Sequence, residues 1–205
     1  MEKMKSLVTL PRYEADGKDS LVSKTFFTQK MKERLDKIKA FIFDVDGVLT
    51  DGGIFANLDG ELFRTFDAKD AFALRMAHMN GYALGCITGG RSESIRKRLA
   101  TCGFRKEDVY LGSRIKLKDF NDFCFRHGVL TDEVMYFGDD IPDIPVLKAC
   151  GCGVCPSDAV DEAKEAADLI SDYPGGKLCV RKTLELVMKA QGKWEVDFET
   201  YDRMF

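Results

Sequence analysis

The chain has 205 residues, of which 45% are hydrophobic and 11% aromatic, enough for one hydrophobic core and too few for two comfortable domains. Its 31 basic and 34 acidic residues leave a net charge of −3, so no strong positive field attracts nucleic acid or an anionic membrane. The 18 glycines and 5 prolines are too few for a collagen-like chain, and the apolar content is too high for the disordered class. We expect one globular domain with no nucleic-acid or membrane partner.

The N-terminal residues and the cysteines both favour a cytoplasmic protein. Glu2, Lys3 and Lys5 precede only a short apolar stretch, unlike the start of a secretory signal. No apolar run reaches the roughly 18 residues that a membrane-spanning helix needs. The seven cysteines are an odd number scattered through apolar segments, where reduced thiols serve as small hydrophobic side chains. We therefore expect a cytoplasmic protein without disulfides.

Residues 1–38 open with a polar, turn-prone stretch. A helix is indicated next, because Phe27, Met31, Leu35 and Ile38 recur at spacings of three to four residues. We predict an N-terminal extension with a lead-in helix over 1–38, a main domain over 39–194 and a C-terminal tail over 195–205.

From residue 40 onward, short apolar runs alternate with helical patterns. The runs are 40–43, 82–87, 109–111, 134–137, 152–155 and 168–170. An Ala-rich helix is expected before the last run, capped near Ser157 or Asp158, and a final helix over 178–191. Such alternation predicts an α/β fold with a doubly wound parallel sheet.

The segment 49–66 departs from this alternation. Asp51-Gly52-Gly53 and Asp59-Gly60 are turn signals, and apolar residues such as Phe55 and Phe63 lie between and after them. The pattern predicts a β-hairpin flap after the first strand, joined at Asp59-Gly60. Phe55, Leu62 and Phe63 either form the core of the hairpin or, since a hairpin buries little by itself, contact another subunit.

Polar side chains follow four of the apolar runs, where the carboxyl ends of parallel strands meet at one edge of the sheet. Crowded carboxylates repel one another unless a cation lies between them, and an all-oxygen cluster suits Mg²⁺. A threonine hydroxyl with glycine N–H groups at a helix start forms a seat for phosphate. The residues concerned are Asp44, Asp46, Thr88, Gly89, Lys116, Asp139, Asp140 and Asp143.

These motifs carry a resemblance to a known family. The segment 43–50, Phe-Asp-Val-Asp-Gly-Val-Leu-Thr, resembles the first motif of the haloacid dehalogenase superfamily. Ile87-Thr88-Gly89, Lys116 and the segment 138–143 resemble its second, third and fourth motifs. The resemblance implies that Asp44 is a nucleophile that takes up a phosphoryl group, and that Asp46 is the general acid and base.

The same resemblance implies the remaining catalytic and metal-binding roles. Thr88 and Lys116 would complete the catalytic set of Asp44 and Asp46. Mg²⁺ would be held by Asp44, by the backbone carbonyl of Asp46 and by Asp139, with Asp140 and Asp143 in support.

The spacing of the motifs favours the branch of this superfamily without a cap domain. The segment 52–87 is filled by the hairpin and one helix, and the segment 89–138 by two strand–helix units. Asp46 argues against an ion-pumping ATPase, which carries Lys-Thr after the nucleophile, and the missing cap argues against a phosphomutase. A phospho-accepting signalling module stays an alternative, because such modules also carry aspartates on doubly wound sheets.

A closer resemblance within that branch is carried by Asp-Gly-Val-Leu-Thr-Asp-Gly at 46–52 and by the segments 66–70, 138–146, 175–176 and 187–193. On these residues, the stretch 38–194 is similar to the 3-deoxy-D-manno-octulosonate 8-phosphate phosphatases, tetramers in which neighbouring subunits close each site. The resemblance implies a sugar-acid phosphate substrate and a homotetramer. Its implied substrate contacts are Asp46, Asp67, Ala68, Lys69, Asp70, Ala71, Arg75, Thr88, Gly89, Arg98 and Lys116.

The chain departs from that family pattern at residues near the substrate. Lys69-Asp70-Ala71 stands where the family has Arg-Asp-Gly, and Gly90 stands where it has Arg. A nine-carbon, sialic-type sugar acid 9-phosphate is therefore the alternative substrate.

Cys150, Cys152 and Cys155 offer a second metal interpretation. Their spacing matches neither paired Cys-x-x-Cys ligands nor a four-ligand set. We expect these cysteines to lie in a buried strand.

Overall fold

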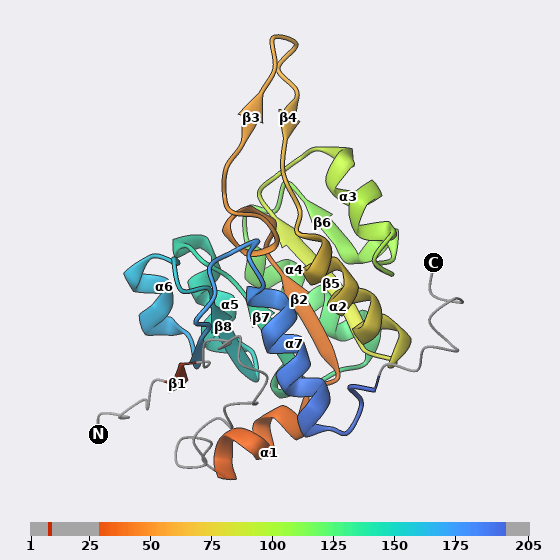
Figure 1. Ribbon diagram of the computed structural model, residues 1–205, viewed down its shortest axis with the longest axis vertical. Helices are drawn as coiled ribbons and strands as arrows, with labels where there is room; N and C mark the ends of the chain where they lie inside the picture. The colour runs from red at the N-terminus through yellow and green to blue at the C-terminus, as the bar shows by residue number, and fades with distance from the viewer. Residues whose placement is uncertain (1–7, 10–28, 196–205) are drawn as a thin grey trace, which may run out of the picture.

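A computed structural model describes residues 8–9 and 29–195 of the chain, with side chains from Met31 onward. Its core is a sheet of seven parallel strands in the order β1-β9-β8-β7-β2-β5-β6 (Figure 1). The strands are β1 (Val8–Thr9), β2 (Ala40–Phe43), β5 (Ala83–Thr88), β6 (Val109–Leu111), β7 (Val134–Phe137), β8 (Cys152–Cys155) and β9 (Leu169–Ile170). The predicted α/β fold with a parallel sheet is confirmed.

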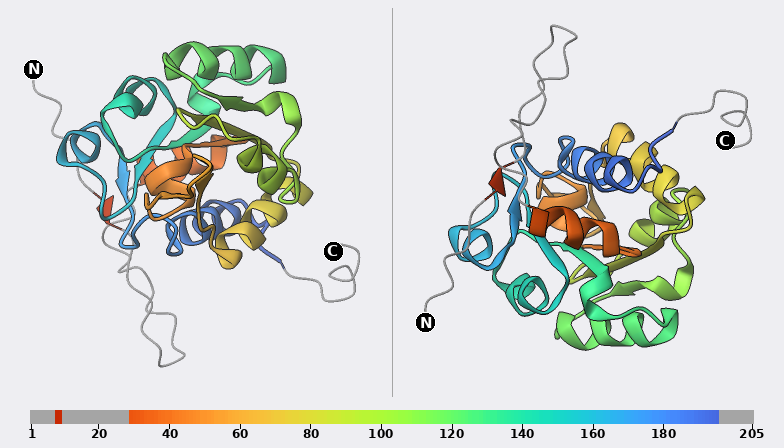
Figure 2. Two further views of the ribbon diagram at one scale, coloured as in Figure 1. Left: turned by 90° about the horizontal axis from the view of Figure 1, so that it is seen from above. Right: turned by 90° about the horizontal axis from the view of Figure 1, so that it is seen from below.

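Helices cover both faces of this sheet (Figure 2). They are α1 (Gln29–Lys37), α2 (Ala68–Met79), α3 (Glu93–Ala100), α4 (Lys116–His127), α5 (Ile144–Ala149), α6 (Asp161–Ala166) and α7 (Cys179–Ala190). Apolar residues of α1, α2, α3 and α7 pack into one hydrophobic cluster, and those of α4, α5 and α6 into a second. Each strand in the middle of the sheet is therefore buried on both sides, which is why it reads as a continuous apolar run.

The order of the strands determines which edge of the sheet can bind a ligand, and we call this edge, at the carboxyl ends of β2, β5 and β7, the functional edge. β2 lies between β5 and β7, and Phe43 at its end is in register with Cys86 of β5 and Phe137 of β7. The chain leaves β2 toward β5 and β6 and then returns to the other side of β2 at β7. Ligands of open α/β sheets bind at the carboxyl ends of the strands where the order reverses, so residues that follow β2, β5 and β7 lie around one crevice.

Above this edge rises the hairpin, residues 54–64, formed by β3 (Phe55–Ala56) and β4 (Leu62–Phe63) (Figure 1). The strands pair antiparallel with Phe55 opposite Phe63, and Gly60 takes a φ of +80° in the turn. Phe55 is 69% exposed, Leu58 107% and Phe63 50%. The hairpin lies where the turn signals predict it, and it displays apolar side chains to solvent.

One local prediction, the cap of α6, differs from the structure. Helix α6 is not capped by Ser157 or Asp158: it begins at Asp161, and its N-cap, Val160, supplies no side-chain hydrogen bond. The Asp158 carboxylate instead accepts a hydrogen bond from the backbone N–H of Gly175 at 2.9 Å. The predicted cap residue is thus used to hold a loop from elsewhere in the chain.

The N-terminal region is partly described. Met31, Leu35 and Ile38 are buried, as the helical spacing predicts, whereas Phe27 lies outside the described residues. Strand β1 pairs with β9 through Val8 and Thr9; two residues carry too little periodicity for this strand to be predicted.

All seven cysteines are free thiols, and six of them are buried. Burial raises the pKa of Cys150 to about 12. Among the described residues, the carboxylates of Asp44, Asp139 and Asp143 form the group that could hold a metal ion, and no cysteine joins it. No helix in the described part of the chain has both the length and the apolar character to cross a membrane.

Candidate active site

Asp44 follows β2 directly and lies at the centre of the functional edge. Its backbone N–H donates to the carbonyl of Phe137 at 2.9 Å, and its carboxylate accepts from the N–H of Val45 at 2.7 Å. The residue is 8% exposed. Burial raises the pKa of Asp44 to about 6, and the neighbouring Lys116 opposes that rise. The carboxylate is therefore fixed in direction and ionised only with the help of nearby positive charge.

Lys116, the first residue of α4, supplies part of that charge. Its Nζ lies 2.8 Å from Oδ2 of Asp44 and 2.7 Å from Oδ1 of Asp143, and its side chain is 6% exposed. Burial alone would lower the pKa of Lys116, but the two carboxylates outweigh burial and raise it. Asp143 also accepts a hydrogen bond from the hydroxyl of Tyr136 at 2.5 Å. The lysine is thus held charged between two acids.

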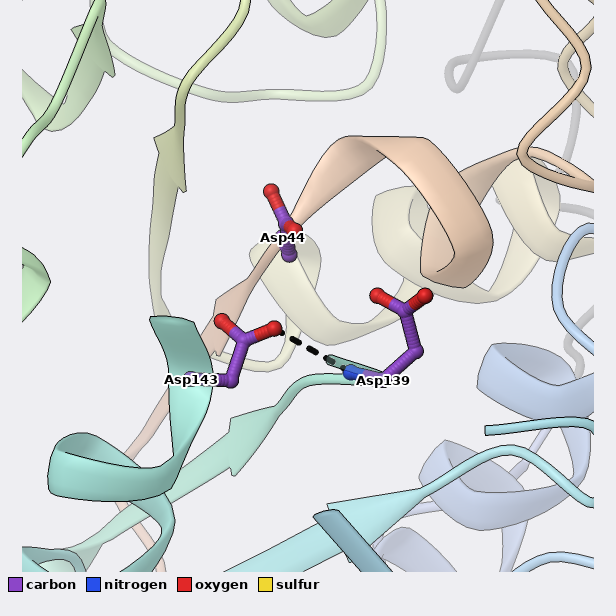
Figure 3. A group of neighbouring side chains, drawn as sticks. All are labelled: Asp44, Asp139 and Asp143. Carbon is purple, nitrogen blue, oxygen red and sulfur yellow. Dashed lines mark hydrogen bonds between the residues drawn. The ribbon is translucent and has the colours of Figure 1, made fainter. Parts of the chain in front are cut away.

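Asp139 follows β7 and faces the same space (Figure 3). Burial, with the charges of Asp44 and Asp143 next, raises the pKa of Asp139 to about 7. Its Oδ1 is buried without a hydrogen-bond partner. Oxygen atoms of Asp44, Asp139 and Asp143 lie within 4.8 Å of one another. An unpaired buried oxygen in a group of three neighbouring carboxylates fits a divalent cation with oxygen ligands.

The backbone between Asp44 and Thr50 forms a tight turn that packs against the carboxylate of Asp139. Gly47 has a φ of +85°, and a Cβ there would lie 2.0 Å from Oδ2 of Asp139. From the opposite side, the N–H of Gly176 donates to the carbonyl of Val48 at 2.9 Å, and a Cβ at Gly175 would lie 1.8 Å from the carbonyl oxygen of Gly47. Only glycine fits at these contacts, so the turn and the loop interlock.

Thr88 and Gly89 end β5 beside this cluster. The Thr88 hydroxyl accepts from the N–H of Gly90 at 3.0 Å, and the space next to Gly89 is open for at least 4 Å. A cavity of about 610 Å³ joins this turn to the carboxylates. Its lining residues are Asp44, Asp46, Gly52, Thr88, Gly89, Gly90, Ser113, Arg114, Lys116, Asp139, Asp140, Pro142 and Asp143.

Asp46 lines this cavity and forms an ion pair with Arg64 that the sequence does not predict. Its two carboxylate oxygens accept hydrogen bonds from Arg64, at 2.6 Å from Nε and 2.9 Å from Nη2. Arg64 follows β4, and its side chain is 4% exposed. Since only the fold of the hairpin brings these residues together, motif spacing gives no signal for the pair.

The other predicted substrate contacts lie outside the cavity. Asp67 caps α2 by accepting from the N–H groups of Lys69 and Asp70. Asp70 is buried and accepts from the N–H of Arg181 at 2.7 Å. These residues do not meet Asp44 within one chain, and neither do Ala68, Ala71, Arg75 and Arg98.

Arg75 and Arg98 both bind Thr101. Nη1 of Arg75 donates to its carbonyl at 2.9 Å, and Nη1 of Arg98 donates to its hydroxyl at 3.0 Å. Arg98 also lines a small crevice with Asp67 and Ala71.

Sequence reasoning also missed Arg114 and Ser113, which line the cavity before α4. Their position immediately before Lys116 at a strand end is the one signal that could have found them. Arg114 is exposed and adds a solvent-accessible positive charge to the lining of the cavity, in contrast to the buried Lys116.

A parallel sheet with Asp-x-Asp after its central strand, a threonine after the next and a buried lysine between two acids defines a haloacid dehalogenase-like hydrolase. The family model of that description matches residues 108–174. The 3-deoxy-D-manno-octulosonate 8-phosphate phosphatase KdsC of Haemophilus influenzae is 33% identical over 83% of this chain and 93% of its own. The same enzyme of Escherichia coli K12 is 33% identical over 78% and 84%. The chain therefore belongs to the haloacid dehalogenase-like hydrolases, in the family that contains these phosphatases.

Solved structures agree with this assignment. A 3-deoxy-D-manno-octulosonate 8-phosphate phosphatase from Moraxella catarrhalis, in complex with magnesium, phosphate and KDO, superposes with a TM-score of 0.77 at 28% identity, covering 86% of this chain and 98% of that one. A hydrolase of the same superfamily from Legionella pneumophila gives a TM-score of 0.80 at 31% identity, covering 85% and 94%.

Proposed function

We propose that the protein is a Mg²⁺-dependent phosphatase that hydrolyses a sugar-acid phosphate monoester through a phosphoryl group carried on Asp44. The observation that carries the proposal is the buried cluster in which Lys116 bridges Asp44 and Asp143 next to Asp139 and Thr88. The 33% identity to phosphatases over most of the chain supports it.

In the first step, a carboxylate oxygen of Asp44 attacks phosphorus while the bond from phosphorus to the sugar oxygen breaks. The position of Asp44 suits this role, because the N–H of Val45 fixes one oxygen at 2.7 Å and Lys116 keeps the group ionised. The Thr88 hydroxyl and the N–H groups of the Gly89-Gly90 turn would bind the phosphoryl oxygens.

Asp46 would supply the proton that the leaving sugar oxygen needs. In the second step it would take a proton from water, which attacks phosphorus and releases Asp44 and phosphate. Its side chain is 27% exposed and lines the cavity, so it can reach both the leaving oxygen and the water.

Asp44, Asp139 and the backbone carbonyl of Asp46 would hold Mg²⁺, with Asp140 and Asp143 in support. When bound, the ion offsets the charges of the phosphate and the nucleophile and holds the attack in line. The unpaired Oδ1 of Asp139 supports this assignment, because a buried carboxylate oxygen without a partner is costly.

For the substrate we propose 3-deoxy-D-manno-octulosonate 8-phosphate, on which the relatives act according to their names. Lys69, Ala71 and Gly90 differ from the family pattern in the region of the sugar, so a nine-carbon sugar acid 9-phosphate is the second candidate. Both substrates combine a carboxylate with a phosphate.

We further propose a homotetramer in which the hairpins associate. The exposed Phe55, Leu58 and Phe63 form the type of apolar surface that marks protein contacts. Association would also let Asp67, Ala71 and Arg98 of one subunit contact substrate in the site of another, since they lie outside the cavity of their own chain.

A phosphate-release screen tests the activity and the substrate together. Eight- and nine-carbon sugar-acid phosphates are compared with hexose phosphates, with and without Mg²⁺. Turnover of one sugar-acid phosphate, lost on chelation, supports the proposal. A lasting phosphorylated protein without turnover would instead indicate a signalling module.

A further inference from the structure

Arg64 is a buried cation that the proposed mechanism leaves without a role. Its guanidinium binds both oxygens of Asp46, at 2.6 Å and 2.9 Å, and its side chain is 4% exposed. The remaining nitrogen, Nη1, is buried without a hydrogen-bond partner. Leaving a charged donor unsatisfied in the interior costs stability, so stability alone does not explain this arginine.

Arg64 lies close to the turn that follows β5 at the functional edge. A Cβ at Gly90 would lie 3.2 Å from Nη2 of Arg64, 3.3 Å from the Thr88 hydroxyl oxygen and 2.9 Å from Cδ1 of Ile95. A side chain at residue 90 would therefore crowd both the guanidinium and the Thr88 hydroxyl. It lies against the proposed phosphate seat and Asp46 at the same time.

The geometry of the pair fixes the direction of Asp46. A planar guanidinium that binds a carboxylate through two parallel hydrogen bonds sets both its position and its plane, which a single lysine contact does not. Asp46 lies on the turn after β2, whereas Arg64 comes from the hairpin. The hairpin thus reaches the site through this one contact between described side chains.

We propose that Arg64 is the positioning residue of Asp46 in the proposed phosphatase, holding that carboxylate toward the leaving oxygen of the substrate. The inference rests on the proposed function for its chemistry. Arg64 itself transfers no proton: Asp46 gives one to the sugar oxygen as the bond to phosphorus breaks, and takes one from water in the second step.

A comparison of leaving groups tests this role. The sugar-acid phosphate that the wild type hydrolyses needs a proton on its leaving alkoxide, whereas p-nitrophenolate leaves from p-nitrophenyl phosphate without one. We expect Arg64→Gln to lower kcat about 10- to 100-fold on the sugar phosphate, which is part of the roughly 100- to 10,000-fold that general acid catalysis supplies, with little change on p-nitrophenyl phosphate. Arg64→Lys should restore only part of the loss, because lysine lacks the two-point contact.

A second comparison tests whether Arg64 affects turnover only through Asp46. In an Asp46→Asn background, Arg64→Gln should cause no further loss on the sugar phosphate, since residues that act through one another are not additive. Arg126→Gln is the matched control, because Arg126 binds Asp108 and Asp122 at 2.9 Å each on the far side of α4, and both activities should be unchanged.

Equal losses on the two substrates, additive losses in the double variant, or a faster Arg64→Gln enzyme would each overturn the inference. A wild type that hydrolyses neither substrate would refute the proposed function instead. In that case, the free energy of unfolding is measured for the wild type, Arg64→Gln, Asp46→Asn and the double variant. Non-additive losses of stability support the pairing of Arg64 with Asp46, and additive losses exclude it.

Discussion

At the carboxyl edge of the sheet, Asp44, Lys116 and Asp143 are each less than a tenth exposed, whereas Phe55 and Phe63 of the hairpin are half exposed or more. The edge is held by short polar contacts between the segments that follow the strands, such as the 2.7 Å contact of Lys116 with Asp143. The hairpin has two paired positions and an open apolar surface. The proposed catalytic groups thus lie buried within one chain, whereas the hairpin above them exposes apolar side chains to solvent.

The first test of this division removes the proposed nucleophile. Asp44→Asn should lower phosphate release by at least about a thousandfold, as loss of a covalent nucleophile does. The fold should persist, because Lys116 keeps its partner Asp143. Phosphate release and circular dichroism measure the two effects. Substantial turnover by a folded variant would contradict the role of Asp44.

The second test concerns the metal. Asp139→Asn should weaken Mg²⁺ binding by at least about tenfold, because it removes a charged ligand and neutral amides bind Mg²⁺ less well. Isothermal titration measures the affinity. Asp161→Asn serves as control, since that side chain is 95% exposed. Equal affinity in both variants would place the ion elsewhere.

The third test addresses the hairpin. Replacing Phe55 and Phe63 together by Ser should reduce the mass in light scattering from a tetramer toward a monomer and lower turnover, while p-nitrophenyl phosphate hydrolysis falls less. Phe125→Ser is the control, because that residue is 85% exposed on α4. A wild-type monomer with full activity would contradict the proposed association.

The fourth test uses pH. In the metal-free protein, burial raises the pKa of Asp44 to about 6 and that of Asp139 to about 7. Both must be ionised to bind Mg²⁺, so affinity should fall as pH drops from about 7 to about 6, and binding should release protons. Titrations in two buffers of different ionisation enthalpy measure that release. An affinity independent of pH would contradict these values.

The smallest effect is expected at Asp70, which lies away from the cavity. Burial raises its pKa to about 6, above the unfolded value of about 4. A raised carboxyl pKa gives stability that is present below the unfolded pKa and lost as pH rises through the folded one. The free energy of unfolding of Asp70→Asn, relative to wild type, should therefore increase by about 2 kcal/mol between pH 4 and 7. No change in that difference would contradict the shift.

Much of the edge could be predicted from sequence because strands buried on both faces read as apolar runs. Phe41, Ile87 and Tyr136 lie in such runs, and the polar residues after them meet by the rule for parallel sheets. The pair of Asp46 and Arg64 could not be predicted, since it depends on how the hairpin folds back. The prediction of a cap for α6 was wrong for a related reason. Asp158 accepts a hydrogen bond from the N–H of Gly175, and local sequence does not show a partner so far along the chain.

The interlocked glycines have a consequence for how the protein is made. The turn that carries Asp44 is completed by Gly175 and Gly176, which leave the ribosome long after it. A nascent chain that stops before residue 175 would hold all four motifs and still lack the glycines that support the turn after Asp44, the proposed nucleophile. We therefore expect activity to require the loop before α7, which is made late in synthesis, in addition to the motifs.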